Sequence, residues 1–120
     1  MKKNNINGWL FIDKPVGVTS FYVIKKIRKF LDIKKIGHSG TLDPLASGVL
    51  GIAIGEATKS IDYLNNKKEY EFNITFGESK TTEDLEGETL DFTRSIPNKK
   101  EIIDILENFL GIVEQDPPKH

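Results

Sequence analysis

The 120-residue sequence has no cysteine, only two histidines, and no apolar run that approaches the length of a membrane span. The lack of cysteine excludes disulfides, thiolate nucleophiles and cysteine-ligated metal sites. Because no stretch of about 20 apolar residues occurs, the sequence predicts no transmembrane helix. The basic start, Met1-Lys2-Lys3-Asn4-Asn5, is not followed by the apolar core of a signal peptide. We therefore expect a cytoplasmic protein that does not contact a membrane.

Motifs for the common cofactors are missing too. The sequence has no P-loop, no dinucleotide fingerprint and no cluster with metal-ligand spacing. We expect a protein that uses neither a nucleotide cofactor nor a metal ion.

The charge of the chain is unevenly distributed. Residues 1–40 carry nine Lys or Arg and two Asp or Glu, whereas residues 41–120 carry eight and sixteen. A basic first third could lie along a phosphate backbone, or its cations could simply form the solvated face of a helix. The residues concerned are Lys25, Lys26, Arg28, Lys29, Lys34 and Lys35.

The first half of the chain alternates strand and helix patterns. Trp9–Ile12 is a short apolar run that Pro15 and Gly17 end, which predicts a strand. Thr19 or Ser20 can cap a helix, and Val49–Ile54 reads as a buried strand. The helix would bury one stripe, made of Val23, Ile24, Ile27, Phe30 and Leu31. Glu56–Leu64 could form a short helix.

The second half begins with the clearest strand pattern in the chain. In Glu69–Phe76, aromatic and apolar residues alternate with polar ones, which predicts a half-buried strand. Residues 78–95 are acidic and read as a long loop or a loose hairpin. A helix capped by Ser95 or Asn98 should run to about Leu110, with its stripe formed by Ile102, Ile105, Leu106, Phe109 and Leu110. A last strand is expected from Ile112, with Pro117 and Pro118 breaking it.

This irregular alternation, with one clearly one-sided strand, favours an α+β domain with a mixed or antiparallel sheet and flanking helices. A doubly wound parallel sheet is disfavoured. A chain of this length suits one small domain or part of a larger one.

The segment richest in chemical information is Gly37-His38-Ser39-Gly40-Thr41-Leu42-Asp43-Pro44-Leu45-Ala46-Ser47-Gly48-Val49-Leu50. Small-residue turns flank one carboxylate, Asp43, which has no basic residue within four positions. A carboxylate on such a loop beside a rigid strand is a candidate nucleophile or base. Alternatively, Asp43-Pro44 is an ordinary turn, because Asp before Pro is common in turns.

This segment resembles the signature of the TruB family of tRNA pseudouridine synthases, G-H-x-G-T-L-D-P-x-A-x-G-V-L, at every specified position. Upstream, residues 8–20 resemble the family's opening motif, G-x-x-x-x-x-K-P-x-G-x-T-S. Downstream, Lys68-Glu69-Tyr70 resembles its K-x-Y motif and Gln115-Asp116-Pro117-Pro118 its Q-x-P-P turn. The matches follow the family order and span nearly the whole chain.

The resemblance implies the pseudouridine synthase fold and an isomerase that converts uridine to pseudouridine in the T-arm loop of tRNA. Asp43 would be the catalytic nucleophile, acting on a nucleotide flipped out of the RNA. Tyr70 would stack on the target base, although a plain core tyrosine would fit the same pattern. His38 would contact the flipped nucleotide, unless it only bonds nearby backbone. Gly40, Thr41 and Leu42 would shape the loop, and Lys14 would support it beside the substrate.

The chain also departs from the family pattern. After Gly77 the family reads x-x-T-D-T-x-D-x-x-G, but Lys80 and Thr81 replace the first Thr and Asp. The family pattern also continues past the Q-x-P-P turn, so we expect residues 1–120 to be the N-terminal portion of a catalytic domain whose remainder is absent. Such a chain would be inactive or nearly so by itself. The alternative is a truncated, catalytically inactive remnant that still binds tRNA. A small acidic-loop hydrolase is a third reading, which no base or metal set supports.

Overall fold

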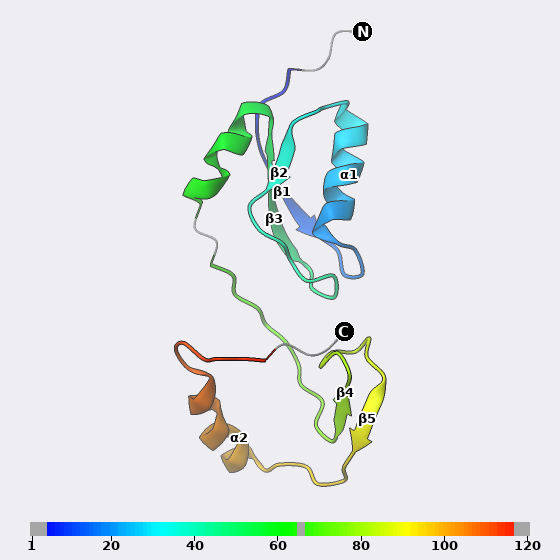
Figure 1. The fold of residues 1–120 in the computed structure, drawn as a ribbon, viewed down its shortest axis with the longest axis vertical. Helices are drawn as coiled ribbons and strands as arrows, with labels where there is room; N and C mark the ends of the chain where they lie inside the picture. Colours follow the sequence, from blue (N-terminus) through cyan, green and yellow to red (C-terminus); the bar gives the residue numbers. More distant parts are fainter. Residues whose placement is uncertain (1–4, 65–66, 117–120) are drawn as a thin grey trace. The chain divides into compact units, whose positions relative to one another are not determined.

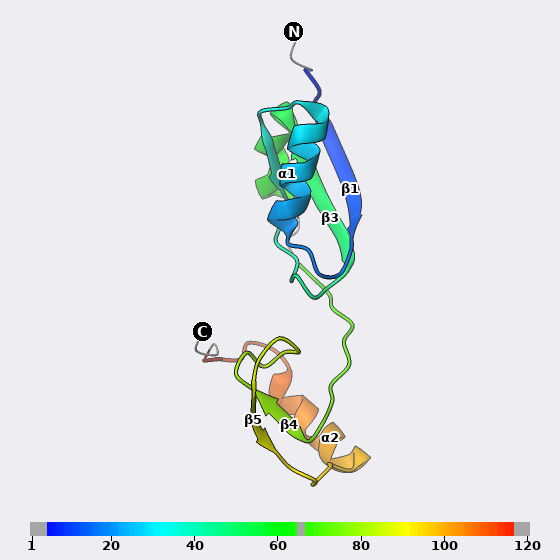
Figure 2. The same ribbon diagram turned by 90° about the vertical axis from the view of Figure 1, so that its right-hand side faces the viewer.

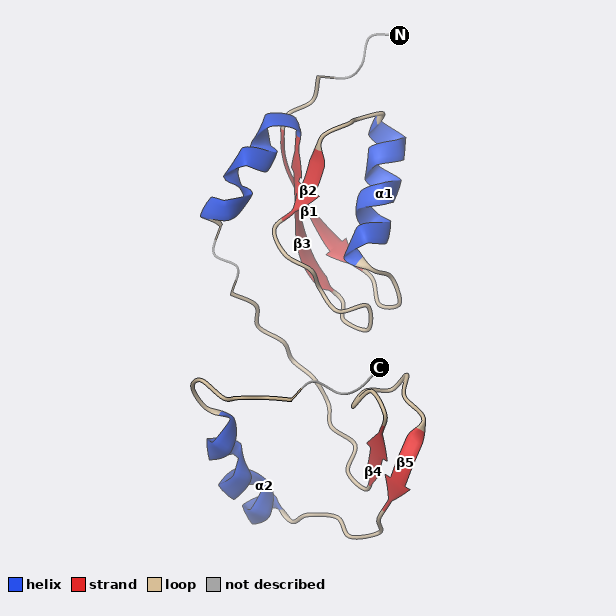
Figure 3. Cartoon of the chain, viewed as in Figure 1, coloured by secondary structure: helices blue, strands red, loops and turns tan. Residues whose placement is uncertain are grey.

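The computed structural model describes residues 5–64 and 67–116, which fall into two units, residues 1–69 and 70–120. Helices accompany small antiparallel sheets in both units (Figures 1 and 3). The α+β class expected from the sequence is therefore confirmed, and every strand pair among the described residues is antiparallel.

A three-stranded sheet forms the centre of the first unit. Its strands are β1 (Gly8–Lys14), β2 (Ile36–His38) and β3 (Gly48–Ile54), in the order β1-β3-β2. The register places Gly8 opposite Ile54 and Lys14 opposite Gly48, so β1 pairs along the whole of β3. The predicted strands at Trp9–Ile12 and Val49–Ile54 are thus confirmed. β2 is an additional strand within a segment that the sequence indicated only as a loop.

The helix α1 (Ser20–Leu31) covers one face of this sheet (Figure 2). Thr19 caps it, because its hydroxyl accepts a hydrogen bond from the backbone N–H of Tyr22 at 3.0 Å. The helix ends at Asp32, which adopts the left-handed conformation. Helix and sheet together bury a core of Val23, Ile33, Leu50, Ile52 and Ile54, with Ile27 and Leu31 partly buried against it.

The prediction that Phe30 belongs to the buried stripe of α1 is wrong. Phe30 is 88% exposed, because it lies off the face of α1 that contacts β3, whereas Ile27 and Leu31 pack against the core. The stripe is therefore narrower than the 3.6-residue periodicity alone suggested.

The short 3-10 helix η1 (Gly55–Tyr63) lies on the opposite side of the sheet from α1, where the sequence predicted a short helix (Figure 1). Trp9 on β1 donates a hydrogen bond from its indole nitrogen to the Ser60 hydroxyl at 3.2 Å. A side chain at Gly37 would meet the Ile61 side chain at 2.8 Å, so the bare backbone of β2 allows this close packing. η1 covers only the Trp9 end of this face, because Phe11 and Val49 remain 67% and 70% exposed.

The second unit contains a two-stranded sheet and one α-helix. Strands β4 (Glu78–Lys80) and β5 (Thr89–Phe92) form the loose hairpin that the sequence suggested. Helix α2 (Lys99–Leu106) follows, with Asn98 and Glu101 forming a reciprocal capping box, and the 3-10 helix η2 (Glu107–Phe109) extends it.

Three expectations for the second unit are wrong. Glu69–Phe76 is not a strand, because no described segment pairs with it, and a strand needs a hydrogen-bonded neighbour. Ile112–Glu114 is likewise unpaired. The apolar stripe of α2 exists in sequence, but its side chains are largely exposed, as are those of Phe72 and Ile74.

Among the described residues, no helix has the length and apolar character needed to cross a membrane. One sequence expectation, the break at Pro117-Pro118, falls outside the described residues.

Candidate active site

The loop between β2 and β3, which carries Asp43, is held by hydrogen bonds on both sides of this residue. The hydroxyl of Ser20 accepts from the backbone N–H of Leu42 at 3.0 Å and lies 3.4 Å from its carbonyl oxygen. On the other side, the carbonyl of Pro44 accepts from the backbone N–H of Gly17 at 2.8 Å. Because Ser20 opens α1 and Gly17 precedes it, the start of this helix sets the path of the loop.

Lys14 supports the same loop from inside the protein. Its side chain is fully buried, and its ammonium donates to the carbonyls of Val18 at 2.7 Å, Pro15 at 2.9 Å and Pro44 at 3.4 Å. Three carbonyl acceptors compensate for the burial of the charge. Lys14 thus supports the backbone of the loop from inside the protein, because its ammonium donates to the carbonyl of Pro44.

Asp43 itself is exposed at the tip of this fixed loop. One carboxylate oxygen accepts from the backbone N–H of Leu45 at 2.8 Å, and the Asp43 carbonyl accepts from Ala46 at 3.0 Å. This is the turn chemistry that the sequence offered as the plain alternative. The turn also orients the carboxylate, since one oxygen is held by the backbone while the side chain stays open to solvent.

His38 and Gly40 lie at the start of the loop. Nδ1 of His38 accepts a hydrogen bond from the backbone N–H of Gly40 at 3.2 Å, so the neutral ring carries its proton on Nε2. This is the local backbone contact that the sequence left open for His38. The ring is half-buried at the end of β2, five residues before Asp43. Of the residues between them, Thr41 is exposed and Leu42 is partly buried.

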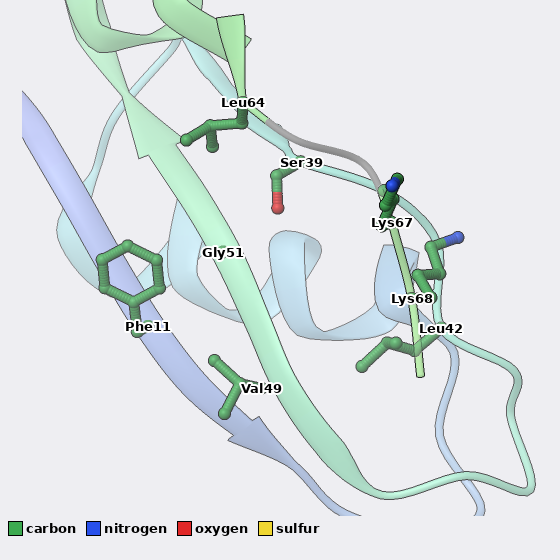
Figure 4. A pocket seen from close by; sticks show the side chains of 9 residues that line it. Phe11, Ser39, Leu42, Val49, Gly51, Leu64, Lys67 and Lys68 are labelled. Carbon is green, nitrogen blue, oxygen red and sulfur yellow. The ribbon is translucent and has the colours of Figure 1, made fainter. Parts of the chain in front are cut away.

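A pocket of about 250 Å³ opens beside this loop on the sheet face opposite α1 (Figure 4). Phe11 and Val49 form its apolar floor, and Lys68 and Lys67 lie on its rim. The side chain of Leu42 lines it, which connects the pocket to the residue before Asp43. An apolar surface beside ammonium groups suits a ligand with flat bases and phosphates.

Tyr70 belongs to the second unit, in the segment that is not a strand, and its side chain is 45% exposed. It is not the core tyrosine that the alternation also allowed. In the same unit, the departure from the family pattern is accommodated locally. Lys80 forms an ion pair with Glu78 at 3.3 Å and donates to the carbonyl of Gly87 at 3.3 Å.

Sequence reasoning missed the roles of two residues near the loop. Ser20 looked like a possible helix cap, but Thr19 takes that role and leaves the Ser20 hydroxyl for Leu42. Lys68 was recognised only as a motif letter, although its ammonium lies 2.5 Å from the carbonyl oxygen of Thr41. The adjacent pair Thr19-Ser20 was the one sequence signal for the role of Ser20. The role of Lys68 has no local signal, since its partner Thr41 lies 27 residues away.

In residues 5–64 and 67–116, no group of three His, Asp or Glu side chains comes together in a way that could hold a metal ion.

Comparison with known proteins gives close relatives. Residues 28–120 match the model of the "TruB family pseudouridylate synthase (N terminal domain)". A tRNA pseudouridine synthase B of Ehrlichia ruminantium is 48% identical over 92% of this chain and 38% of its own length. The protein of that name from Gluconobacter oxydans is 51% identical over 95% of this chain and 34% of its own length.

Among solved structures, a Cbf5-Nop10-Gar1 complex is similar, with 43% identity and a TM-score of 0.46 over 50% of this chain and 18% of that chain. The chain spans less than two fifths of the length of these relatives. The family model covers most of the chain and includes the whole Asp43 loop, so this chain belongs to the TruB family of pseudouridylate synthases.

Proposed function

We propose that this chain provides the N-terminal portion of the catalytic domain of a tRNA pseudouridine synthase, with Asp43 as the nucleophile. The observation that carries the proposal is the exposed carboxylate of Asp43 on a loop whose backbone is held on both sides, at Leu42 and at Pro44. A nucleophile works best when its geometry is fixed before the substrate arrives, because positioning supplies much of the rate enhancement.

The reaction is an isomerisation and needs no redox partner. The bond between N1 of uracil and C1′ of the ribose breaks, the base turns, and a bond forms between C5 and C1′. The hydrogen on C5 leaves as a proton, and N1 gains one, so atoms and electrons balance. A single carboxylate can stabilise or capture the intermediate between these two bond changes.

The substrate is a uridine within folded RNA, for which we propose the T-arm loop of tRNA. The target nucleotide must leave its stack to reach Asp43, and Tyr70 would stack on the everted base. His38, with its proton on Nε2, would face the RNA beside the loop. Lys25 and Lys29 on α1 are exposed and would contact phosphates of the stem.

The test is tritium release from a tRNA transcript labelled at C5 of its uridines, with RNA binding measured in parallel. The wild-type sequence, joined to the remainder of the catalytic domain, should release tritium, and Asp43→Asn in the same protein should bind RNA normally and release none. Asp62→Asn is the matched control, since Asp62 is an exposed aspartate on η1, away from the loop. Release by the Asp43→Asn variant would overturn the proposed nucleophile. Binding without release by the wild-type protein would instead identify an RNA-binding member that has lost the reaction.

A further inference from the structure

Lys68 contacts the candidate nucleophilic loop from a distant part of the sequence. Its Nζ lies 2.5 Å from the carbonyl oxygen of Thr41, two residues before Asp43. Figure 4 shows the Lys68 side chain next to Leu42 at the edge of the pocket. The contact therefore reaches the part of the loop that leads into Asp43.

The glycine at position 40 leaves room for this contact. A Cβ atom at Gly40 would lie 3.2 Å from Cε of Lys68 and 3.6 Å from its Nζ, which is tight for the first pair. Gly40 also has a φ of +148°, a backbone conformation that other residues rarely adopt. The glycine at position 40 thus allows both the backbone turn and the close approach of the Lys68 side chain to Thr41.

The other hydrogen bonds that hold the loop involve Leu42 and Pro44 and do not involve the Thr41 carbonyl. Ser20 holds Leu42, and Lys14 and Gly17 hold Pro44, whereas the Thr41 carbonyl accepts a hydrogen bond from Lys68. A hydrogen bond from an ammonium is stronger and more directional than one between neutral groups. Removing it frees the segment on the amino-terminal side of Leu42.

We propose that Lys68 is a positioning residue that acts through the Thr41 carbonyl to hold the Asp43 carboxylate in its reactive orientation. The inference rests on the proposed function for the reaction that it affects, but the contact itself can be tested without catalysis. The competing role for an exposed lysine beside RNA is direct binding of a phosphate.

The experiment compares three variants of the whole chain. Lys68→Met removes the donor, Lys68→Arg keeps one, and Lys99→Met is the control, which removes an exposed ammonium at the start of α2. Backbone NMR shifts of Thr41, Leu42 and Asp43 report the loop, and RNA affinity and single-turnover tritium release report function.

With Lys68→Met, we expect changed shifts at all three residues, a roughly tenfold slower release of tritium and an RNA dissociation constant within about twofold of wild type. Lys68→Arg should restore most of the shifts and the rate, and Lys99→Met should leave both unchanged. Unchanged loop shifts in Lys68→Met would overturn the proposal, and weaker RNA binding with unchanged shifts would assign Lys68 to a phosphate. If wild-type protein releases no tritium, the proposed function fails, and the NMR comparison alone decides the positioning role.

Discussion

The hydroxyl of Ser20 and the backbone of Leu42 form a paired contact, in which Ser20 accepts from the Leu42 N–H at 3.0 Å and faces its carbonyl at 3.4 Å. Ser20 is the first residue of α1 and is only 1% exposed, so the contact is shielded from water. It connects the helix that covers the sheet to the loop that presents Asp43. The stability of the first unit and the geometry of the candidate site therefore depend on the same contact.

Ser20→Ala should destabilise the protein by about 1–3 kcal/mol, because the Leu42 N–H would be left buried without its acceptor. Urea unfolding followed by circular dichroism measures the loss. Ser47→Ala, at an exposed serine of the same loop, is the control and should change stability little. Equal effects of the two substitutions would contradict the importance of the Ser20 contact.

Lys14→Met should lower the free energy of unfolding by about 1.5–3 kcal/mol, because the buried ammonium that donates to the carbonyls of Val18, Pro15 and Pro44 disappears. Amide hydrogen exchange at Leu45 and Ala46 should accelerate, since the loop loses the support of Lys14 at Pro44. Lys25→Met replaces an exposed lysine of α1 and serves as the matched control. A Lys14→Met variant as stable as this control would show that the buried ammonium is not needed.

Ile27 and Phe30 test which residues of α1 contact the core. Ile27→Ala should lower the free energy of unfolding by about 1–3 kcal/mol, since Ile27 is partly buried against the core. Phe30→Ala should stay within about 0.5 kcal/mol of wild type, because Phe30 is 88% exposed. Thermal unfolding of both variants makes the comparison, and a larger loss for Phe30→Ala would contradict this packing.

Glu56 should give the protein a small dependence of stability on acid. Hydrogen bonds from Lys59 and then Lys35, with the charges of both, hold the pKa of the Glu56 carboxyl below its ordinary value of 4.5. A carboxyl with a lowered pKa in the folded protein adds stability above its ordinary value, and this contribution disappears as the pH falls through the lowered pKa. The effect is small, because the pair is exposed and screened by salt.

Melting temperatures of wild-type protein and Glu56→Gln, measured from pH 7 to pH 3 at low salt, test this dependence. The two proteins should differ at pH 7 and converge below pH 4.5, with the difference reduced in 1 M salt. A difference that grows as the pH falls would contradict the assigned direction.

The basic face of α1 should contribute to RNA binding through charge alone. Replacing Lys25 and Lys29 together by Gln should weaken binding of a T-arm stem-loop and reduce the slope of log K against log salt by about 2, one for each phosphate contact. Lys99 and Lys100 at the start of α2, replaced in the same way, are a control for net charge. If the two double substitutions weaken RNA binding equally, the attraction is nonspecific and α1 carries no dedicated binding face.

Much of the first unit follows from local sequence signals. The cap at Thr19, the apolar positions of α1 and the runs that form β1 and β3 are each visible within a dozen residues. The strand expected at Glu69–Phe76 shows the limit of such signals. Its alternation is clear, but alternation describes only the faces of a strand, and the hydrogen-bonded neighbour must come from elsewhere in the fold.

By itself, the sequence determined the family motifs, the candidate carboxylate of Asp43 and the α+β class, because residue identity and periodicity are local properties. Only the tertiary structure decided what holds that carboxylate in place. Lys14, Ser20 and Lys68 lie 22 to 30 residues in sequence from the loop residues whose carbonyls and amides they contact, and no local pattern encodes such pairs. Those contacts exist because packing of α1 on the sheet, and the close approach allowed at Gly40, bring distant polar atoms within hydrogen-bonding distance.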